Sequence, residues 1–126
     1  MYAALILVNS EPEHAQKYSL QDYPVVLGRG PNADVQVSDP WVSRNHCVID
    51  ASECTLIVKD LDTSNGTFVN GCEVVVAPLM PGDHLIIGTH VFRVAYQRSS
   101  LDLPPPTIYR RQPKDDQENL NTTQPL

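Results

Sequence analysis

Five short groups of residues between positions 28 and 71 carry the cations and neutral donors from which an anion site could be built. They follow one another in the order Gly28-Arg29, Ser43-Arg44-Asn45-His46, Asp60-Leu61, Ser64-Asn65-Gly66-Thr67 and Val69-Asn70-Gly71. A phosphorylated side chain carries nearly two negative charges and several acceptor oxygens at neutral pH. Its receptor therefore needs a planar cation and further donors at short range. Each group alone is common in proteins, but the five in this order, between short apolar segments, indicate a selective anion site.

Arg29 and Arg44 are the candidate cations of this site. Arg29 follows an apolar segment that ends at Gly28, so its guanidinium would lie in a loop, where it can bind two phosphate oxygens at once. For Arg29 taken alone, a solvated surface arginine after a turn is the simpler alternative. Arg44 would add a second charge beside Ser43, and we expect both the hydroxyl and the backbone N–H of Ser43 to donate to the anion.

Ser64 and Asn65 are the candidate donors of a second loop. The side-chain amide of Asn65 can donate and accept at once, which suits it to hold the backbone of an extended peptide beside its phosphorylated residue. Ser64 can donate to the phosphate or to the peptide. Asn65-Gly66 is also a turn signal, and the two roles are compatible.

Ser43 and His46 could also be read as the nucleophile and base of a hydrolase. No carboxylate has a spacing that would orient the histidine ring, and no metal motif or phosphate-cradling helix accompanies the pair. We therefore expect a protein that is not an enzyme and binds no metal, and a hydrolase stays as an alternative.

The acidic balance of the chain argues against binding to nucleic acid or to an anionic membrane. There are 9 Lys and Arg against 15 Asp and Glu, a net charge of −6, whereas those partners require a basic face. The apolar residues 1–8 are too few to span a membrane and lack the basic start of a signal peptide. Cys47, Cys54 and Cys72 have no CxxC spacing, so we expect reduced thiols and a cytoplasmic location.

The segments that must position these residues have the pattern of short β-strands. Apolar runs alternate with Gly, Pro, Asn and Asp, and no helical period of any length appears. We expect ten strands, near residues 2–8, 16–20, 25–28, 35–37, 46–50, 55–61, 67–69, 72–76, 84–87 and 90–96. This pattern predicts an all-β fold, a two-sheet antiparallel β-sandwich with the candidate site in loops at one end.

Three local features refine this prediction. Asn70-Gly71 favours the positive φ angles of a type I′ hairpin turn, and Cys47 is expected to be a small core residue. After Gln97 the chain turns rich in proline and polar residues, which offer little surface to bury. We therefore expect a domain over residues 1–97 and a flexible tail over residues 98–126.

These motifs resemble those of the forkhead-associated (FHA) domain family over roughly residues 2–96. The resemblance implies non-catalytic recognition of phosphothreonine-containing peptides or proteins, downstream of a Ser/Thr kinase and without a cofactor. The phosphopeptide-binding residues that it implies are Arg29, Ser43, Arg44, Ser64 and Asn65, the last as the clamp on the peptide backbone. The site scaffold that it implies consists of Gly28, His46, Gly66 and Asn70, with His46 bridging loops by hydrogen bonds. For Trp41, which could anchor a loop or touch the peptide, we favour the anchor.

Two further uses of the chain stay open. A domain of the same fold could act as a phosphate-independent assembly module through a sheet face. In addition, the tail carries Thr122-Thr123, with Leu126 three residues after Thr123, and in some FHA domains an apolar residue at that distance favours binding. Phosphorylated Thr123 could then bind the domain's own site or that of a second chain, although an inert tail is the simpler alternative.

Overall fold

The computed structural model describes residues 2–8, 16–97 and 109–110. These residues form eleven strands and no helix, and none of them belongs to a helix long and apolar enough to cross a membrane. The strands are β1 (Ala3–Leu7), β2 (Lys17–Leu20), β3 (Val25–Gly28), β4 (Val35–Gln36), β5 (Cys47–Ser52), β6 (Thr55–Asp60), β7 (Thr67–Val69), β8 (Cys72–Leu79), β9 (His84–Ile87), β10 (His90–Tyr96) and β11 (Tyr109–Arg110).

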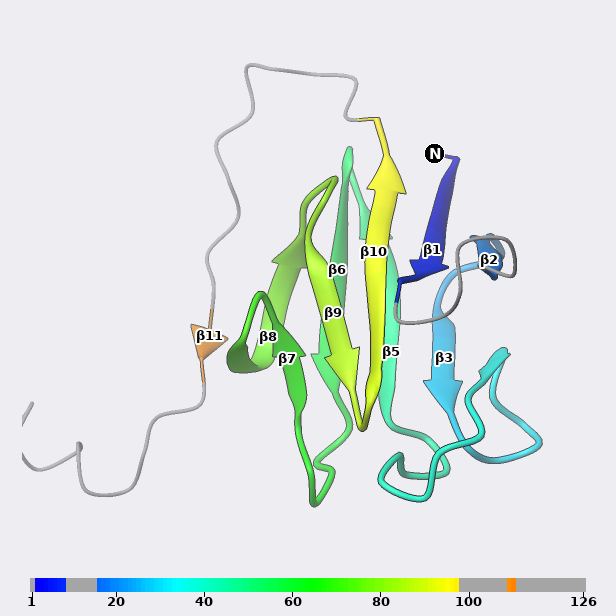
Figure 1. The fold of residues 1–126 in the computed structure, drawn as a ribbon. Helices are drawn as coiled ribbons and strands as arrows, with labels where there is room; N and C mark the ends of the chain where they lie inside the picture. The colour runs from blue at the N-terminus through cyan, green and yellow to red at the C-terminus, as the bar shows by residue number, and fades with distance from the viewer. Residues whose placement is uncertain (1, 9–15, 98–108, 111–126) are drawn as a thin grey trace, which may run out of the picture.

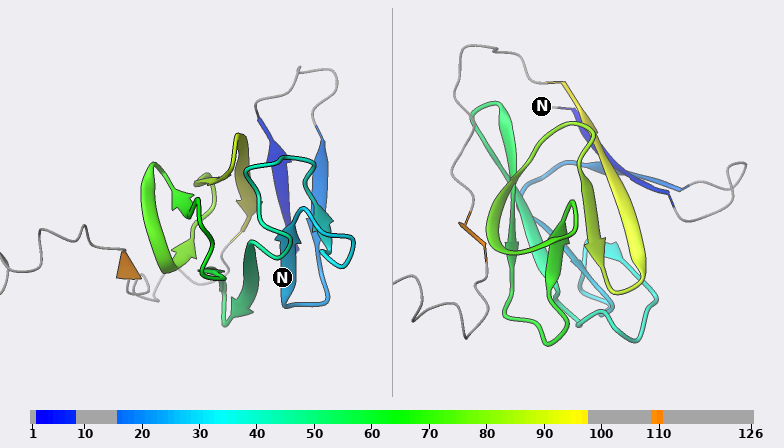
Figure 2. Two further views of the ribbon diagram at one scale, coloured as in Figure 1. Left: turned by 90° about the horizontal axis from the view of Figure 1, so that it is seen from below. Right: turned by 60° about the vertical axis from the view of Figure 1, so that its left-hand side comes forward.

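Hydrogen-bonded pairing joins the strands in the order β2-β1-β10-β9-β7-β8-β6-β5-β3-β4, with β11 beside β8. The path folds over itself, so that β9 and β10 lie in front of β5 and β6 (Figures 1 and 2). All ten predicted strands are present, and the all-β sandwich is confirmed. The strand predicted over residues 72–76 continues to Leu79, because Ala77 and Pro78 still pair with β6 although a proline cannot donate to the ladder.

Two features of the pairing differ from the prediction. The expectation that all pairs would be antiparallel is wrong for β3 and β4, which pair in parallel through Leu27 with Val35 and Gly28 with Gln36. The connection between them can be short because β4 has only two residues. In addition, β11 comes from the predicted tail and pairs with Val74 and Val76 of β8, where β8 changes its partner from β7 to β6. The rest of the predicted tail lies outside the described residues.

The core lies between the two layers, where alternate residues of each strand point inward. Its largest fully buried apolar side chains come from both layers: Leu5, Leu27, Ile49, Leu56, Leu79, Leu85, Ile87 and Phe92. Cys47 is fully buried among them, which confirms its prediction as a core residue. Burial and the nearby charge of Asp60 raise the pKa of the Cys47 thiol to about 12, so this group stays protonated at neutral pH.

The loops that carry the candidate residues gather at one end of the sandwich. The β3–β4, β4–β5 and β6–β7 loops and the β9–β10 turn all lie at the lower end in Figure 1, whereas β1 begins and β10 ends at the upper end. At Asn70-Gly71 the φ angles are 52° and 85°, and Val69 pairs with Cys72. The predicted type I′ turn is therefore confirmed.

Candidate functional site

Arg29 lies at the end of β3 and is fixed by the neighbouring loop. Its backbone N–H donates to the Ser43 carbonyl at 2.9 Å, and its Nε donates to the Val42 carbonyl at 2.9 Å. The Nη groups of this exposed side chain have no hydrogen-bond partner among the described residues. The guanidinium is thus held at one edge while its forked end stays available to an anion.

The two candidate arginines border the same hollow, of about 570 Å³. Its lining residues are Arg29, Gly30, Pro31, Asn32, Arg44 and Asn45. No acidic side chain contributes to this lining, so the hollow is a cationic site on an acidic chain. Asn32 and Asn45 were missed in the sequence analysis; Asn45 lies inside one of the five motifs and could have been inferred from its amide donors.

Gly28 and Gly30 allow the β3–β4 and β4–β5 loops to pack backbone against backbone. A Cβ on Gly28 would lie 2.0 Å from the Arg44 carbonyl oxygen, and the Gly30 N–H donates to that same oxygen at 3.1 Å. Only glycine fits such an approach. This contact brings Arg44 to the side of Arg29.

His46 is fully buried and connects two loops. Its Nδ1 lies 3.0 Å from the Ser43 backbone nitrogen, and its Nε2 lies 2.8 Å from the Gly66 carbonyl oxygen. A backbone N–H can only donate and a carbonyl can only accept, so Nδ1 is unprotonated and Nε2 carries the hydrogen. The ring therefore lies where the resemblance implies a bridge.

This geometry corrects one expectation for Ser43. The backbone N–H of Ser43 donates to the His46 ring, so it is not available to an anion as predicted; the hydroxyl is the remaining donor. The turn formed by residues 43–46 brings the His46 ring back to the Ser43 N–H at the beginning of the same turn. The spacing of the two residues in the sequence did not reveal this contact. Because the ring accepts from an amide rather than from the Ser43 hydroxyl, the arrangement also lacks the contact that a hydrolase needs.

Asp60 stabilises the β6–β7 loop by hydrogen bonds, a role that the sequence analysis did not assign to it. This buried carboxylate accepts from the Thr63 hydroxyl at 2.8 Å, the Thr63 N–H at 3.1 Å and the Thr67 hydroxyl at 2.7 Å. The Thr63 hydroxyl also accepts from the Gly66 N–H at 2.9 Å. An aspartate with threonines three and seven residues later is the signal that could have found this network.

Ser64 and Asn65 are both exposed on this loop. The Asn65 Nδ2 donates to the Trp41 carbonyl at 2.9 Å, which links the β6–β7 loop to the β4–β5 loop. Its Oδ1 and second amide hydrogen remain for a ligand. The structure thus brings Arg29, Ser43, Arg44, Ser64 and Asn65 to the same end of the molecule.

Asn70 is not brought to this end. It lies at the opposite end of the three-residue β7 from Gly66, roughly 13 Å along the strand. Its side chain bonds to the Asp83 carboxylate at 3.1 Å and to the His84 N–H at 2.9 Å. Asn70 therefore closes the hairpin and joins it to β9, without contacting the other candidates.

Trp41 does not anchor its loop, contrary to the prediction. Its side chain is 60% exposed, and its backbone, together with Asp39, fixes the loop instead. Trp41 borders a second hollow of about 270 Å³ with Asn65, Phe68, Gly88 and Thr89. An exposed tryptophan beside a candidate clamp residue favours contact with a ligand.

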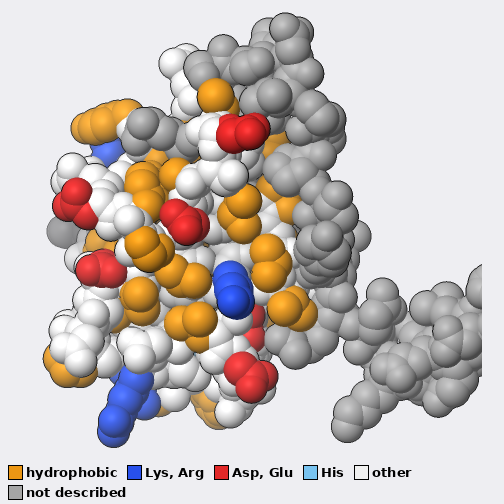
Figure 3. All heavy atoms as spheres, turned by 180° about the vertical axis from the view of Figure 1, so that it is seen from behind, with side chains coloured by type: hydrophobic (Ala, Val, Ile, Leu, Met, Phe, Trp, Pro, Cys, Tyr) orange, Lys and Arg blue, Asp and Glu red, His pale blue; other side chains and the backbone are white. Residues whose placement is uncertain are grey.

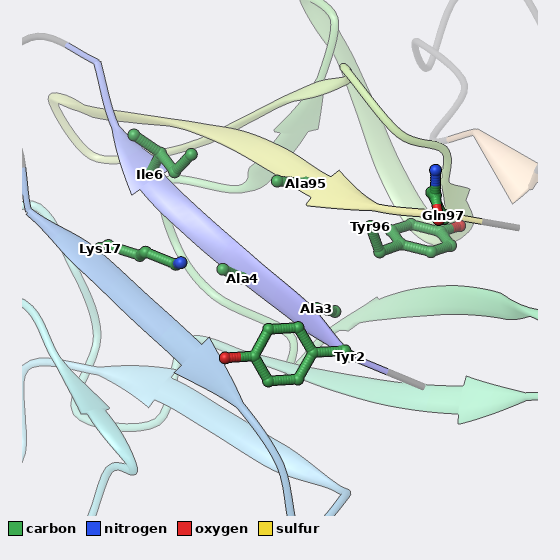
Figure 4. A pocket seen from close by; sticks show the side chains of 8 residues that line it. All are labelled: Tyr2, Ala3, Ala4, Ile6, Lys17, Ala95, Tyr96 and Gln97. Atoms are coloured by element: carbon green, nitrogen blue, oxygen red, sulfur yellow. The ribbon is translucent and has the colours of Figure 1, made fainter.

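A third hollow lies away from these loops. It measures about 590 Å³ and is lined by residues of β1 and β10 with Tyr2, Lys17 and Gln97 (Figure 4). Lys17 is its only charged side chain, so it lacks the convergent donors of the loop site. Among the described residues, no group of three or more His, Cys, Asp or Glu side chains could hold a metal ion.

The model of the FHA domain family matches residues 25–88, a span that contains every candidate site residue. The chain belongs to the FHA domain family. Among solved structures, one from a structural and functional analysis of phosphothreonine-dependent FHA domain interactions superposes with a TM-score of 0.71 at 28% identity, covering 77% of this chain and 98% of that one. Mycobacterium tuberculosis EmbR in complex with a low-affinity phosphopeptide superposes with a TM-score of 0.70 at 27% identity, over 79% of this chain and 25% of that one.

Two curated relatives are regulators by name. The glycogen accumulation regulator GarA of Mycobacterium tuberculosis is 32% identical over 94 residues, which cover 75% of this chain and 57% of GarA. The oxoglutarate dehydrogenase inhibitor of Corynebacterium jeikeium is 30% identical over 100 residues, which cover 79% of this chain and 68% of the inhibitor. The match thus spans little more than half of the length of GarA.

Proposed function

We propose that this FHA domain binds phosphothreonine-containing proteins without catalysis, as a regulator in Ser/Thr kinase signalling. The observation that carries the proposal is the hollow of about 570 Å³ between Arg29 and Arg44. The phosphothreonine-dependent interactions studied in a structurally similar FHA domain support the choice of ligand. The names of the two relatives support a regulatory role, and three free cysteines are consistent with a cytoplasmic location.

Each binding residue has a distinct role in this proposal. The fork of Arg29, the Ser43 hydroxyl and Arg44 bind phosphate oxygens, Ser64 lines the phosphothreonine pocket, and the amide of Asn65 holds the peptide backbone. Charge-assisted hydrogen bonds contribute roughly 1.5–3 kcal/mol each, less the free energy of ordering an extended peptide. We expect affinities around the micromolar range.

Replacement of Arg29 tests the site. Loss of its fork should weaken binding of a phosphothreonine peptide by roughly 10- to 100-fold in Arg29→Ala, measured by isothermal titration calorimetry. Arg93→Ala is the matched control, because Arg93 is an exposed arginine on β10. Equal affinities of Arg29→Ala and the parent would show that the phosphate binds elsewhere.

The hollow bordered by Trp41 and Phe68 extends the proposal to the neighbouring residues of the peptide. At about 270 Å³ it is smaller than most small-molecule pockets and suits a single side chain. We propose that an apolar residue near the phosphothreonine strengthens binding. A phosphothreonine peptide library with varied flanking residues tests this; equal recovery of apolar and polar flanks would reject it.

A phosphate-independent assembly module is the second candidate. The face formed by β5, β6 and their neighbours carries many hydrophobic side chains, with acidic and basic ones among them (Figure 3). On it, Val26, Val48, Ile57 and Val76 are half-buried. A protein partner that binds equally well after phosphatase treatment, and equally to Arg29→Ala, would favour this function.

We also propose that the tail can be a ligand of the same site. Thr123 lies outside the described residues and follows the end of β11 by 13 positions. A flexible chain of that length would span about 20 Å, and phosphorylated Thr123 would bind either the domain's own site or that of a second chain. NMR spectra of unmodified and Thr123-phosphorylated protein at several concentrations test this. Unchanged amide shifts of Ser43 and Asn65 would reject it.

A further inference from the structure

Asp39 lies in the β4–β5 loop, four residues before Ser43, and is 4% exposed. Its Oδ1 accepts from the Trp41 N–H at 2.9 Å. Its Oδ2 accepts from the Thr89 N–H at 2.8 Å, the Thr89 hydroxyl at 2.7 Å and His90 Nδ1 at 3.0 Å. One carboxylate thus joins the loop to the β9–β10 turn, 50 residues away in the sequence.

A buried carboxylate is stable only when its charge is met by donors. Burial by itself would raise the pKa of Asp39, but the hydrogen bonds from Thr89, Trp41 and His90 hold that pKa well below its ordinary value. Asp39 is therefore ionised in the folded protein at neutral pH. The turn also approaches it closely, since a Cβ on Gly88 would lie 2.6 Å from Oδ2.

The segment that Asp39 fixes is the one that orients two binding residues. The Asp39 carbonyl accepts from the Val42 N–H at 3.0 Å, and the Val42 carbonyl accepts from Arg29 Nε at 2.9 Å. The Trp41 carbonyl accepts from Asn65 Nδ2 at 2.9 Å. Hydrogen bonds therefore connect Asp39 through Val42 to Arg29, the proposed phosphate contact, and through Trp41 to Asn65, the proposed peptide clamp.

We propose that Asp39 is a positioning residue of the phosphopeptide site, through which the β9–β10 turn fixes the backbone that orients Arg29 and Asn65. The inference rests on the proposed function for its effect on binding. Its effect on the peptide-free loop does not depend on that function.

Asp39→Asn distinguishes a positioning role of Asp39 from a simple effect of its charge, because the two predict opposite changes in phosphopeptide affinity. Removing a negative charge near an anion site should tighten phosphate binding if charge alone matters. Positioning predicts weaker binding, because the side chain of asparagine has one acceptor oxygen and cannot serve both Trp41 and Thr89.

Asp83→Asn is the matched control. Asp83 also holds a turn, accepting from the Met80 N–H at 2.8 Å and from Asn70 Nδ2 at 3.1 Å. Asp83 directly precedes β9, whereas Asp39 contacts Gly88 and Thr89, which follow β9. The two aspartates therefore act at opposite ends of that strand. Asp39→Asn should lose more thermal stability than Asp83→Asn, because Asp39 is more buried and accepts four hydrogen bonds rather than two. Only Asp39→Asn should change the recognition end, the loop end that carries Arg29, Ser43 and Asn65.

We expect Asp39→Asn to bind a phosphothreonine peptide roughly tenfold more weakly than the parent, with Asp83→Asn unchanged. In the peptide-free protein, ¹⁵N relaxation should show new motion at Trp41, Val42 and Arg44 in Asp39→Asn alone. Tighter or unchanged binding by Asp39→Asn, or equal weakening in both variants, would overturn the proposal. If Asp39→Asn does not fold, Thr89→Val removes one of the four hydrogen bonds to Asp39. No new motion in the loop together with parental affinity in that variant would overturn the proposal.

If the parent binds no phosphothreonine peptide, the proposed function is wrong. The relaxation measurement then still decides whether Asp39 orders the loop.

Discussion

Asn65-Gly66 and Asn70-Gly71 are the same dipeptide at opposite ends of β7, yet they do different things. Gly66 and Gly71 have nearly equal φ angles, 87° and 85°. A Cβ on Gly71 would meet nothing within 4 Å, whereas one on Gly66 would lie 2.5 Å from a Glu73 carboxylate oxygen. The first pair lies in the packed recognition end, and the second closes an exposed hairpin.

The asparagines differ in the same way. Asn65 donates to the Trp41 carbonyl of another loop, while Asn70 bonds to Asp83 and His84 beside its own hairpin. Both residues of Asn70-Gly71 have positive φ angles, whereas at Asn65-Gly66 only the glycine does, so the same dipeptide adopts two backbone conformations. Its function depends on which other segments the fold places next to it.

The largest difference in stability between the recognition end and the hairpin is expected for glycine substitutions. Gly28→Ala would place a methyl group 2.0 Å from the Arg44 carbonyl oxygen, and we expect a loss of about 3 kcal/mol or more in the free energy of unfolding, because the obstacle is backbone. Gly71→Ala should lose only about 1 kcal/mol from its positive φ. Urea unfolding of both variants measures this, and equal losses would mean that the recognition end is no more tightly packed than the hairpin.

The asparagines give the next effect. Asn65→Ala should weaken phosphopeptide binding by about 1.5 kcal/mol, roughly tenfold, since it removes the proposed clamp on the peptide and its link to Trp41. Asn70→Ala should leave affinity unchanged and lower stability by about 1 kcal/mol through its lost hydrogen bonds. Calorimetric titration and thermal unfolding of each variant separate the two outcomes. A drop in affinity for Asn70→Ala would make the opposite end part of the site after all.

The smallest effect concerns the ligand rather than the protein. A pocket for the threonine methyl should favour phosphothreonine over phosphoserine by about 0.8 kcal/mol, roughly fourfold. Matched peptides that differ only in this methyl, titrated in parallel, give the ratio directly. The same ratio should persist in Asn70→Ala, because that residue does not reach the recognition end. A ratio of one would remove the methyl pocket from the proposal.

Much of the fold could be predicted from the sequence because it depends on neighbours along the chain. Alternation of apolar and polar residues located ten strands, and Asn70-Gly71 specified its turn through the φ angles that these residues tolerate. The parallel pairing of β3 with β4 could not be found in this way, because it depends on how the loop of residues 29–34 crosses over.

The same distinction, between what local sequence shows and what depends on packing, applies to the candidate site. Residue types alone indicate which side chains could donate to a phosphate, since donor chemistry belongs to the residue type. The bond from the Ser43 N–H to His46, the exposure of Trp41 and the contact of Asp39 with Thr89 became apparent only in the folded chain. Hydrogen bonds between residues as far apart as 50 positions depend on how the strands pack, and local sequence preferences carry no record of that packing.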